Sequence, residues 1–232
     1  MSVQNILLSG VVGSTAYGLA HAGSDVDRLG LFAAPTEELH GLHPPKESHV
    51  GTAPDRTLHE AAKWCRLALG GNPTVTELVW LPDELYDVRA PLGDELVGIR
   101  TTFLSARRVR DAYLGYATQQ FRRLLGRGDG SFSADTRKRT AKHARHLKRL
   151  CGQGYELYTT GQLSIRVDDP ESFHRFGEQV ADDPETALPL LRRYETAFEE
   201  ARSVLPEQPD ERAADAWLRR VRRHFYTPEP SS

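Results

Sequence analysis

Residues 13–30 read GSTAYGLAHAGSDVDRLG, in which a Gly-Ser pair precedes two aspartates that stand two positions apart. Side chains of a β-strand alternate between its two faces, so Asp25 and Asp27 are predicted to point to the same face. Two negative charges on one face repel each other unless a cation lies between them. Ligand sets made only of oxygen atoms select hard ions such as Mg²⁺. The stretch therefore predicts a divalent-metal site near the start of the chain.

The segments around this stretch show strand and helix patterns in turn. Their apolar residues predict a buried strand over 4–13, a short helix over 14–20, a second strand over 25–34 and a turn of helix over 36–42. Residues 43–54 carry prolines, glycine and polar residues, and are predicted to form a loop. The first part of the chain is thus predicted to build a small sheet with short helices.

A longer helix is predicted after the loop. It begins near Leu58, because apolar residues recur at helical spacing from there until Gly70 stops it. A second short helix starts with Pro73 in its first turn. Asp55 falls just ahead of the first helix, where a short third strand could carry it to the same edge as the aspartate pair. The alternative is that Asp55 is an ordinary helix N-cap.

Strand signals largely vanish from Ser105 onward. Helical periodicity covers 105–128, 133–161, 184–205 and 210–225. Ser105 and Ser133 stand where N-caps are expected. The exception is LSIRV at 163–167, which is predicted to be a short strand or an extended arm.

We therefore expect an α+β protein with two parts. A small mixed-sheet module is predicted over 1–95 and a helical module over 100–226, joined around 90–104, with a disordered tail over 227–232. At 232 residues and 39% hydrophobic composition, the chain is long and apolar enough to bury a core.

Cysteine usage and the start of the chain indicate a compartment. Cys65 and Cys151 form neither a disulfide framework nor a metal-finger pattern, which favours a reducing environment and a cytoplasmic location. The apolar start has no basic flank and is broken by Ser9 and Gly10. It is too short to span a bilayer, so we expect no signal peptide, no transmembrane helix and no membrane partner.

Charge is distributed unevenly along the chain. Residues 100–150 carry 14 Lys and Arg against 3 Asp and Glu, although the formal net charge of the whole chain is only -2. Clustered cations supply affinity for phosphates, so a nucleic-acid partner is one interpretation of this basic block. The other interpretation is a solvated helical face whose arginines pair with acidic neighbours.

The Gly-Ser pair adds a phosphate site to the predicted metal site. A strand that ends at Gly13 and Ser14 and runs at once into a helix presents backbone N–H groups and a hydroxyl to an anion. Tyr17 follows closely enough to stack on a base. Together these features indicate a metal-bound nucleoside triphosphate and phosphoryl transfer assisted by two metal ions.

Two carboxylates are too few for two metal ions, so a third is expected on a neighbouring strand. Asp55 is the best candidate. It could hold the catalytic metal and act as a base, or orient the acceptor hydroxyl. Glu60 and Glu47 are the substitutes if Asp55 serves as a cap.

These residues resemble a known family. A Gly-Ser pair, a helix and then SDVD are similar to the signature of the DNA polymerase β type nucleotidyltransferase superfamily, and GSTAYGLAHAGSDVDRLG resembles its RNA-ligase-associated branch. Blocks at 55–82, 103–124 and 142–166 resemble further blocks of that branch. The likeness runs from about Leu8 to Arg166 and implies a polymerase β palm-like fold for the sheet module.

The resemblance also implies roles for individual residues. Gly13 and Ser14 would hold the triphosphate, while the three aspartates would hold two Mg²⁺ ions, with Mn²⁺ as an alternative. Lys63, Asn72, Lys142 and His143 lie in blocks that the branch shares, and Lys142 would neutralise phosphate charge.

Arg28 departs from the pattern of the branch. The branch commonly has its arginine one position later than Arg28. A shift of one residue on a strand points the guanidinium to the other face, so a nucleotide-binding role for Arg28 is a separate prediction.

The function predicted from these residues is transfer of a nucleoside monophosphate from an NTP to an acceptor hydroxyl, with release of pyrophosphate. The basic helices favour an RNA end, such as that of a tRNA, as the acceptor. Three alternatives stay open: a nucleotide-sensing or RNA-binding module without catalysis, a glycosyltransferase that uses its acid pair on a nucleotide sugar, and an antitoxin nucleotidyltransferase that modifies a hydroxyl of a partner protein.

Overall fold

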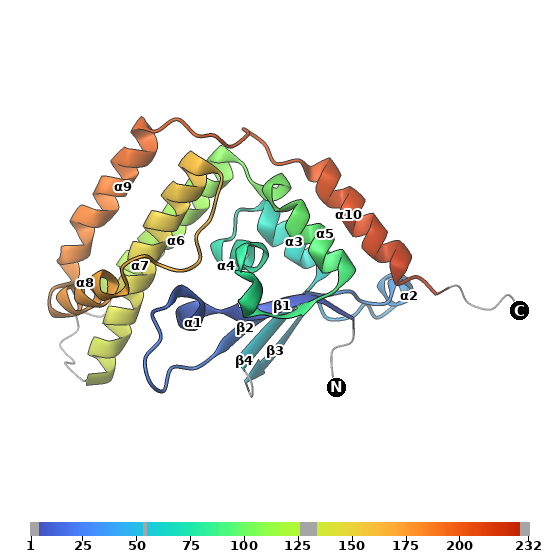
Figure 1. Cartoon of the computed structure of the whole chain (residues 1–232), viewed down its shortest axis with the longest axis horizontal. Coiled ribbons are helices and arrows are strands. Elements are labelled where there is room, and N and C mark those ends of the chain that lie inside the picture. The colour runs from blue at the N-terminus through green and yellow to red at the C-terminus, as the bar shows by residue number, and fades with distance from the viewer. Residues whose placement is uncertain (1–4, 53–54, 126–133, 228–232) are drawn as a thin grey trace, which may run out of the picture. The chain divides into compact units, whose positions relative to one another are not determined.

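The computed structural model describes residues 5–52, 55–125 and 134–227. The chain forms two compact units (Figure 1). The sheet unit contains the residues up to Leu104 and those from Pro209 onward, and the helical unit contains Ser105–Gln208. This division differs from the predicted ranges 1–95 and 100–226, because the last helix returns to the sheet unit.

A five-stranded mixed sheet forms the centre of the sheet unit. Its order is β3-β4-β2-β1-β5. The strands are β1 (Ile6–Val12), β2 (Asp27–Phe32), β3 (Ser48–Thr52), β4 (Asp55–Glu60) and β5 (Tyr86–Arg89). β2 and β4 run parallel, whereas the other neighbours are antiparallel. A mixed sheet followed by a helical region confirms the predicted α+β class.

Two of these strands correct the predictions for 43–71. β3 lies within the predicted loop, and β4 occupies the start of the predicted helix, which begins at Ala61 instead of near Leu58. Leu58 is 1% exposed on β4, and a buried strand residue three positions before Ala61 also fits helical spacing. The helix N-cap is Glu60, whose carboxylate accepts a hydrogen bond from the Ala62 N–H at 2.8 Å. Asp55 is therefore not the cap.

Short helices complete the sheet unit. They are α1 (Gly13–Tyr17), α2 (Thr36–His40), α3 (Ala61–Leu69), α4 (Pro73–Glu77), α5 (Pro91–Gly98) and α10 (Glu211–His224), with 3-10 turns at Leu78–Trp80, Asp83–Leu85 and Arg100–Phe103. The short helix predicted at Pro73 is confirmed as α4. Its N-cap is Asn72, whose side-chain oxygen accepts from the Val75 N–H at 3.2 Å.

Helix α10 is held in the sheet unit by contacts far apart in the sequence. Trp217 is fully buried and its indole N–H donates to the Leu92 carbonyl at 2.9 Å. The Arg222 guanidinium donates to both carboxylate oxygens of Glu60, at 2.6 and 2.9 Å. Figure 1 shows α10 beside α3 and α5, which it contacts. These contacts explain why α10 does not belong to the helical unit.

The helical unit consists of α6 (Ala106–Leu125), α7 (Ala134–Thr160), α8 (Pro170–Asp182) and α9 (Leu188–Glu200), with a 3-10 turn at Pro184–Ala187. Ser105 caps α6 as predicted, since its hydroxyl accepts from the Arg108 N–H at 3.4 Å. Ser133 and the tail from 228 lie outside the described residues. The 163–167 segment forms no strand, and the Gln153 amide holds it by donating to the Ser164 carbonyl at 2.7 Å.

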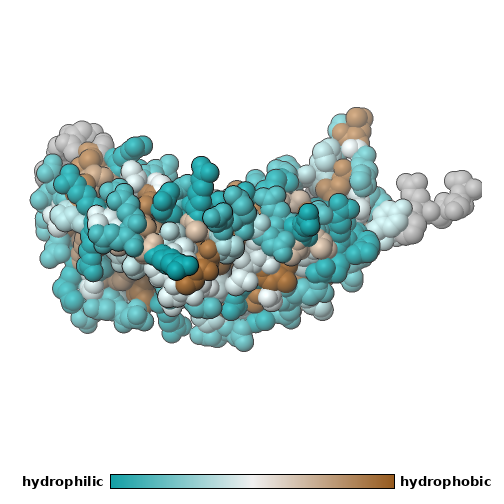
Figure 2. Space-filling model, turned by 90° about the horizontal axis from the view of Figure 1, so that it is seen from above, coloured by the Kyte–Doolittle hydropathy of each residue, from teal (hydrophilic) through white to brown (hydrophobic). Residues whose placement is uncertain are grey.

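The face of the molecule that Figure 2 shows is mainly hydrophilic, and its hydrophobic residues form small separate patches. Exposed large hydrophobic side chains are scattered along the sequence, which is ordinary for a globular protein. Within the described ranges, no helix has the length and apolar character needed to cross a membrane.

The two cysteines are free and buried, one in each unit. Burial is the main reason that the pKa of each thiol, Cys65 and Cys151, is raised to about 12. Such thiols stay protonated near neutral pH and are poor nucleophiles.

Candidate functional site

The Gly-Ser turn and the second aspartate of the pair lie against each other. Val12, the last residue of β1, pairs with Asp27, the first residue of β2. The chain turns at Gly13, whose φ of +71° is a conformation that residues with a side chain rarely adopt. A Cβ on Gly13 would overlap the Oδ2 atom of Asp27. Glycine at this position thus leaves room for the carboxylate beside the turn.

Gly13→Ala is expected to destabilise the sheet unit more than Gly23→Ala. Both glycines have positive φ, so each substitution costs about 1 kcal/mol of backbone strain. A Cβ on Gly23 meets nothing within 4 Å, whereas a Cβ on Gly13 must displace Asp27. Overpacking adds about 1 kcal/mol or more to the Gly13 variant. The measurement is the free energy of unfolding in urea.

A double-mutant cycle identifies the cause of this difference. Asp27→Ala removes the overlapping carboxylate, so in its background Gly13→Ala should cost only the strain of Gly23→Ala. Equal costs for Gly13→Ala in both backgrounds would show that the carboxylate is not what the glycine accommodates.

The structure brings Asp27 and Asp55 to the same edge of the sheet. β2 and β4 are parallel, and Arg28 pairs with Arg56. Asp27 and Asp55 each precede that pair by one residue and begin their strands. Side chains in register on neighbouring parallel strands point to the same face. The short strand considered for Asp55 is therefore present, and it places this carboxylate beside Asp27.

Asp25 lies outside the strand. β1 ends at Val12, which leaves no partner for residues before Asp27, so β2 begins there. A turn precedes Asp25, in which the Ser24 N–H donates to the His21 carbonyl at 3.0 Å. The prediction that Asp25 lies on the strand is therefore wrong, and its approach to Asp27 stays a prediction. No cluster of three or more carboxylate, imidazole or thiol groups suited to a metal ion occurs among the residues that the structure describes.

The turn at Ser14 differs from the predicted helix terminus. α1 has only five residues, so its dipole is small, and what the turn offers an anion is its N–H groups and the Ser14 hydroxyl. The turn is closed by the Leu19 N–H, which donates to the Ser14 carbonyl at 2.8 Å. Ser14 is half-buried, and its hydroxyl makes no hydrogen bond within the described ranges.

Tyr17 is engaged by a residue that the sequence did not single out. Its hydroxyl donates to the Glu77 carboxylate at 2.5 Å, and Glu77 is only 1% exposed. This contact ties α1 to α4 and sets the position of the Gly-Ser turn. The sequence signal for Glu77 was a glutamate within the apolar stretch NPTVTELVW. No local pattern could show that its partner is Tyr17, 60 positions away. Base stacking by Tyr17 stays a prediction.

Arg28 forms an ion pair across the sheet. It follows Asp27 directly on β2, so strand alternation places it on the opposite face. Its Nε donates to the Asp87 carboxylate of β5 at 3.1 Å. A nucleotide-binding role for Arg28 stays a prediction.

Lys63 lies on α3, which follows the end of β4 opposite Asp55. His59 shares the alternation of Asp55 on β4, and Ser48 hydrogen-bonds its Nδ1 at 2.8 Å. Burial first, and then the positive charge of Lys63, lower the pKa of His59. His59 pairs with Leu31, towards the other end of the parallel strands from Asp27 and Asp55, so a nucleotide-binding role for Lys63 stays a prediction.

The two substitute carboxylates are used elsewhere. Glu60 caps α3 and binds Arg222, while Glu47 forms an ion pair with Arg66. Because Asp55 is not a cap, it remains the candidate for the third carboxylate.

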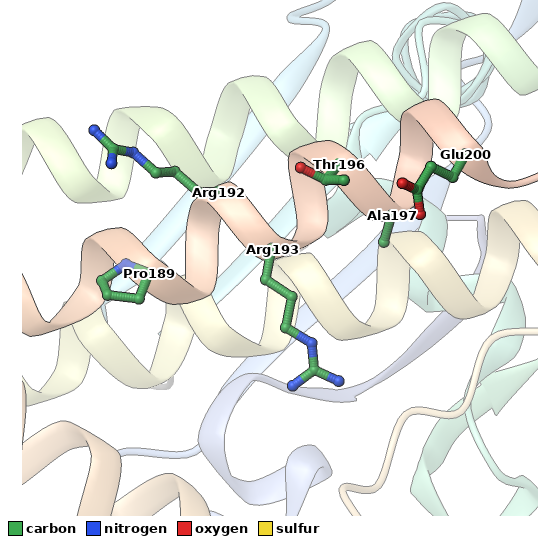
Figure 3. A pocket seen from close by; sticks show the side chains of 6 residues that line it. All are labelled: Pro189, Arg192, Arg193, Thr196, Ala197 and Glu200. Carbon is green, nitrogen blue, oxygen red and sulfur yellow. The ribbon is translucent and has the colours of Figure 1, made fainter.

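Lys142 and His143 belong to the helical unit. Lys142 is exposed on α7, and His143 Nδ1 hydrogen-bonds Gln120 Oε1 of α6 at 2.7 Å. Whether Lys142 neutralises phosphate charge stays a prediction. The open hollow in Figure 3 is lined by one face of α9 and includes no predicted site residue: Pro189, Arg192, Arg193, Thr196, Ala197 and Glu200.

Acid is expected to destabilise the helical unit through His146. The pKa of His146 is lowered to about 3. Burial is the largest cause, followed by the positive charges of Arg149, His143, Lys142 and Arg123. The unfolded chain takes up a proton on this imidazole near pH 6.5, so between those two values the unfolded state binds more protons. The free energy of unfolding therefore decreases as the pH is lowered through that window, by about 2 kcal/mol between pH 6.5 and 5.

His146→Gln provides the comparison. Arg149 Nη2 lies 3.0 Å from His146 Nδ1, and a glutamine oxygen offers the same acceptor without titrating. We expect the wild type to lose about 2 kcal/mol more than the variant between pH 7 and pH 5 in urea unfolding. Equal losses would contradict the role of His146.

Comparison with known proteins gives one family and no significant match to a curated protein. The matching family model is described as the RNA repair pathway DNA polymerase beta family (RlaP), and it covers residues 2–186. The match contains the whole sheet, the Gly-Ser turn and the three aspartates, and it extends the resemblance seen in the sequence beyond Arg166. With about four fifths of its length matched, the chain belongs to the RNA repair pathway DNA polymerase beta family, and so to the polymerase beta-type nucleotidyltransferases.

Proposed function

We propose that this chain transfers a nucleoside monophosphate from an NTP to a hydroxyl at an RNA end, in a reaction that depends on Mg²⁺. The observation that carries the proposal is the arrangement at one sheet edge. There the Gly-Ser turn lies against Asp27, and Asp55 stands beside Asp27 on the neighbouring parallel strand. The family supplies the reaction class, and the basic helices favour RNA as the acceptor.

The donor atoms suit a magnesium ion, and two of the three candidate ligands, Asp27 and Asp55, stand side by side at this edge. The candidate ligands are Asp27, Asp55 and Asp25, which offer only carboxylate oxygens, as Mg²⁺ prefers. Because Gly13 has no Cβ, the Asp27 carboxylate has room beside the Gly-Ser turn. Bound Mg²⁺ would neutralise phosphate oxygens and activate the acceptor hydroxyl, and Mn²⁺ suits the same ligands.

The chain's own residues would bind the phosphates and handle one proton. The N–H groups of the turn and the Ser14 hydroxyl bind phosphate oxygens. The acceptor oxygen attacks the α-phosphorus while the bond from that phosphorus to the bridging oxygen breaks. Pyrophosphate leaves with that oxygen. The hydroxyl proton passes to the Asp55 carboxylate and then to water.

The test uses the purified full chain, the four NTPs labelled at the α-phosphate, and RNA with a free 3′ hydroxyl. Label on the RNA with an equal amount of released pyrophosphate is the expected result, and EDTA should abolish both. NTP binding without transfer to RNA, tRNA or protein would favour a nucleotide-sensing module. Label found on a protein alone would show an antitoxin-like activity and contradict the proposal.

A further inference from the structure

The basic block divides into paired and unpaired cations. Arg107 and Arg110 pair with Asp111, and Arg137 pairs with Glu178 and Asp182. Five other exposed cations of α6 and α7 have no ion pair within the described part of the chain: Arg122, Arg123, Lys138, Arg139 and Lys142. The acid-paired interpretation therefore applies to one part of the block only.

The unpaired cations lie at one end of the α6–α7 pair. α6 and α7 pack antiparallel. A Cβ on Gly154 would overlap the Tyr113 ring, and His143 hydrogen-bonds Gln120, which lies further along α6. The last turn of α6 therefore lies beside the first half of α7. Arg123 follows Gln120 by one turn.

Helical spacing gathers the α7 cations on one side. Lys138 and Lys142 are one turn apart, and Arg139 adjoins them. Arg123 and Lys142 both lower the pKa of His146, which places the cations of the two helices near one imidazole. We call the five unpaired cations the basic end.

We propose that the basic end is the surface on which the phosphate backbone of the RNA acceptor docks. The inference rests on the proposed function and assigns the acceptor a place on the helical unit. Exposed cations without carboxylate partners release counterions when they meet phosphates, which drives binding without base contacts. A protein partner would need buried apolar anchors. Leu125 is the one large exposed hydrophobic side chain found among the described residues of α6 and α7.

The experiment compares two triple variants of the full chain. One replaces Lys138, Arg139 and Lys142 by Gln, and the control replaces the paired Arg107, Arg110 and Arg137 by Gln. Both remove three positive charges at exposed helical positions, where Gln preserves helix propensity. Binding of a fluorescein-labelled 20-nucleotide single-stranded RNA is measured in EDTA without NTP, so that no catalysis is required.

The basic-end variant should bind at least about tenfold more weakly, and its slope of log affinity against log salt should decrease by about 2, since each phosphate contact on a single strand contributes about 0.7. The paired-arginine control should stay near wild type. Equal losses in both variants, or no binding by the wild type at low salt, would overturn the proposal. Competition by polyglutamate as effective as that by poly(U) would also overturn it.

The two proposals can fail separately. Asp27→Asn should bind this RNA as the wild type does, since the readout needs no metal. RNA binding that depends on the basic end without any nucleotidyl transfer would contradict the proposed function alone. Transfer to RNA with binding that is indifferent to the basic-end variant would contradict the docking surface alone.

Discussion

Asp27→Asn is expected to reduce nucleotidyl transfer at least about 100-fold, the loss typical when one group that stabilises transition-state charge is removed. Asparagine keeps the size of the side chain over Gly13 but removes the negative charge that would hold the metal. The free energy of unfolding of the same variant shows whether a loss of activity comes from a loss of the fold. Initial rates of label transfer and urea unfolding of the same preparation measure the two effects.

Asp215→Asn is the matched control. Asp215 lies on α10 in the same unit and pairs with Arg219 at 2.6 Å, with both side chains more than half exposed. The chemical change is identical, and exposed pairs contribute little to stability. Transfer should therefore stay at the wild-type rate. If Asp27→Asn kept more than about a tenth of the wild-type rate, Asp27 could not be a metal ligand in the way proposed here.

Arg222→Met is expected to lower the free energy of unfolding by about 3 kcal/mol, because it leaves a buried carboxylate without its cation. The Glu60 side chain is 5% exposed and the Arg222 side chain 19%. Glu60 also caps α3, so the loss of Arg222 weakens the junction of β4, α3 and α10. Urea unfolding followed by tryptophan fluorescence measures it, since Trp64 and Trp217 are buried in this unit.

Arg220→Met on the same helix serves as the comparison. Arg220 pairs with Glu95 at 2.9 Å, but their side chains are 43% and 45% exposed, so its loss should cost less than about 1 kcal/mol. Adding Glu60→Gln to Arg222→Met should recover part of the stability, because glutamine still caps α3 without a buried charge. Similar costs for the two arginine variants would show that Glu60 does not need Arg222.

Much of the site could be predicted from residues 13–30. A glycine at a turn, an apolar strand before it and a strand after it are local features, because they depend on the backbone preferences of neighbouring residues. Asp27 and Gly13 accordingly lie together as the pattern indicates. The same local rules placed Asp25 on the strand, and this was wrong because the partner strand ends at Val12.

Short strands and long-range pairs were beyond the reach of local patterns. β5 has only four residues, alternately exposed and half-buried, and Leu58 fits a strand as well as a helix. Glu60 and Arg222 are 162 positions apart, so nothing near either residue indicates the other. The same holds for Tyr17 and Glu77.

The sequence by itself indicated the family and the residues proposed for the site, because both depend on motifs within short stretches. Only the tertiary structure decided that Asp55 stands beside Asp27, that α10 belongs to the sheet unit, and which cations of the basic block are paired. The physical reason is distance. Backbone preference acts between neighbours in the sequence, whereas ion pairs and strand register act between residues that only the folded chain brings within a few ångströms.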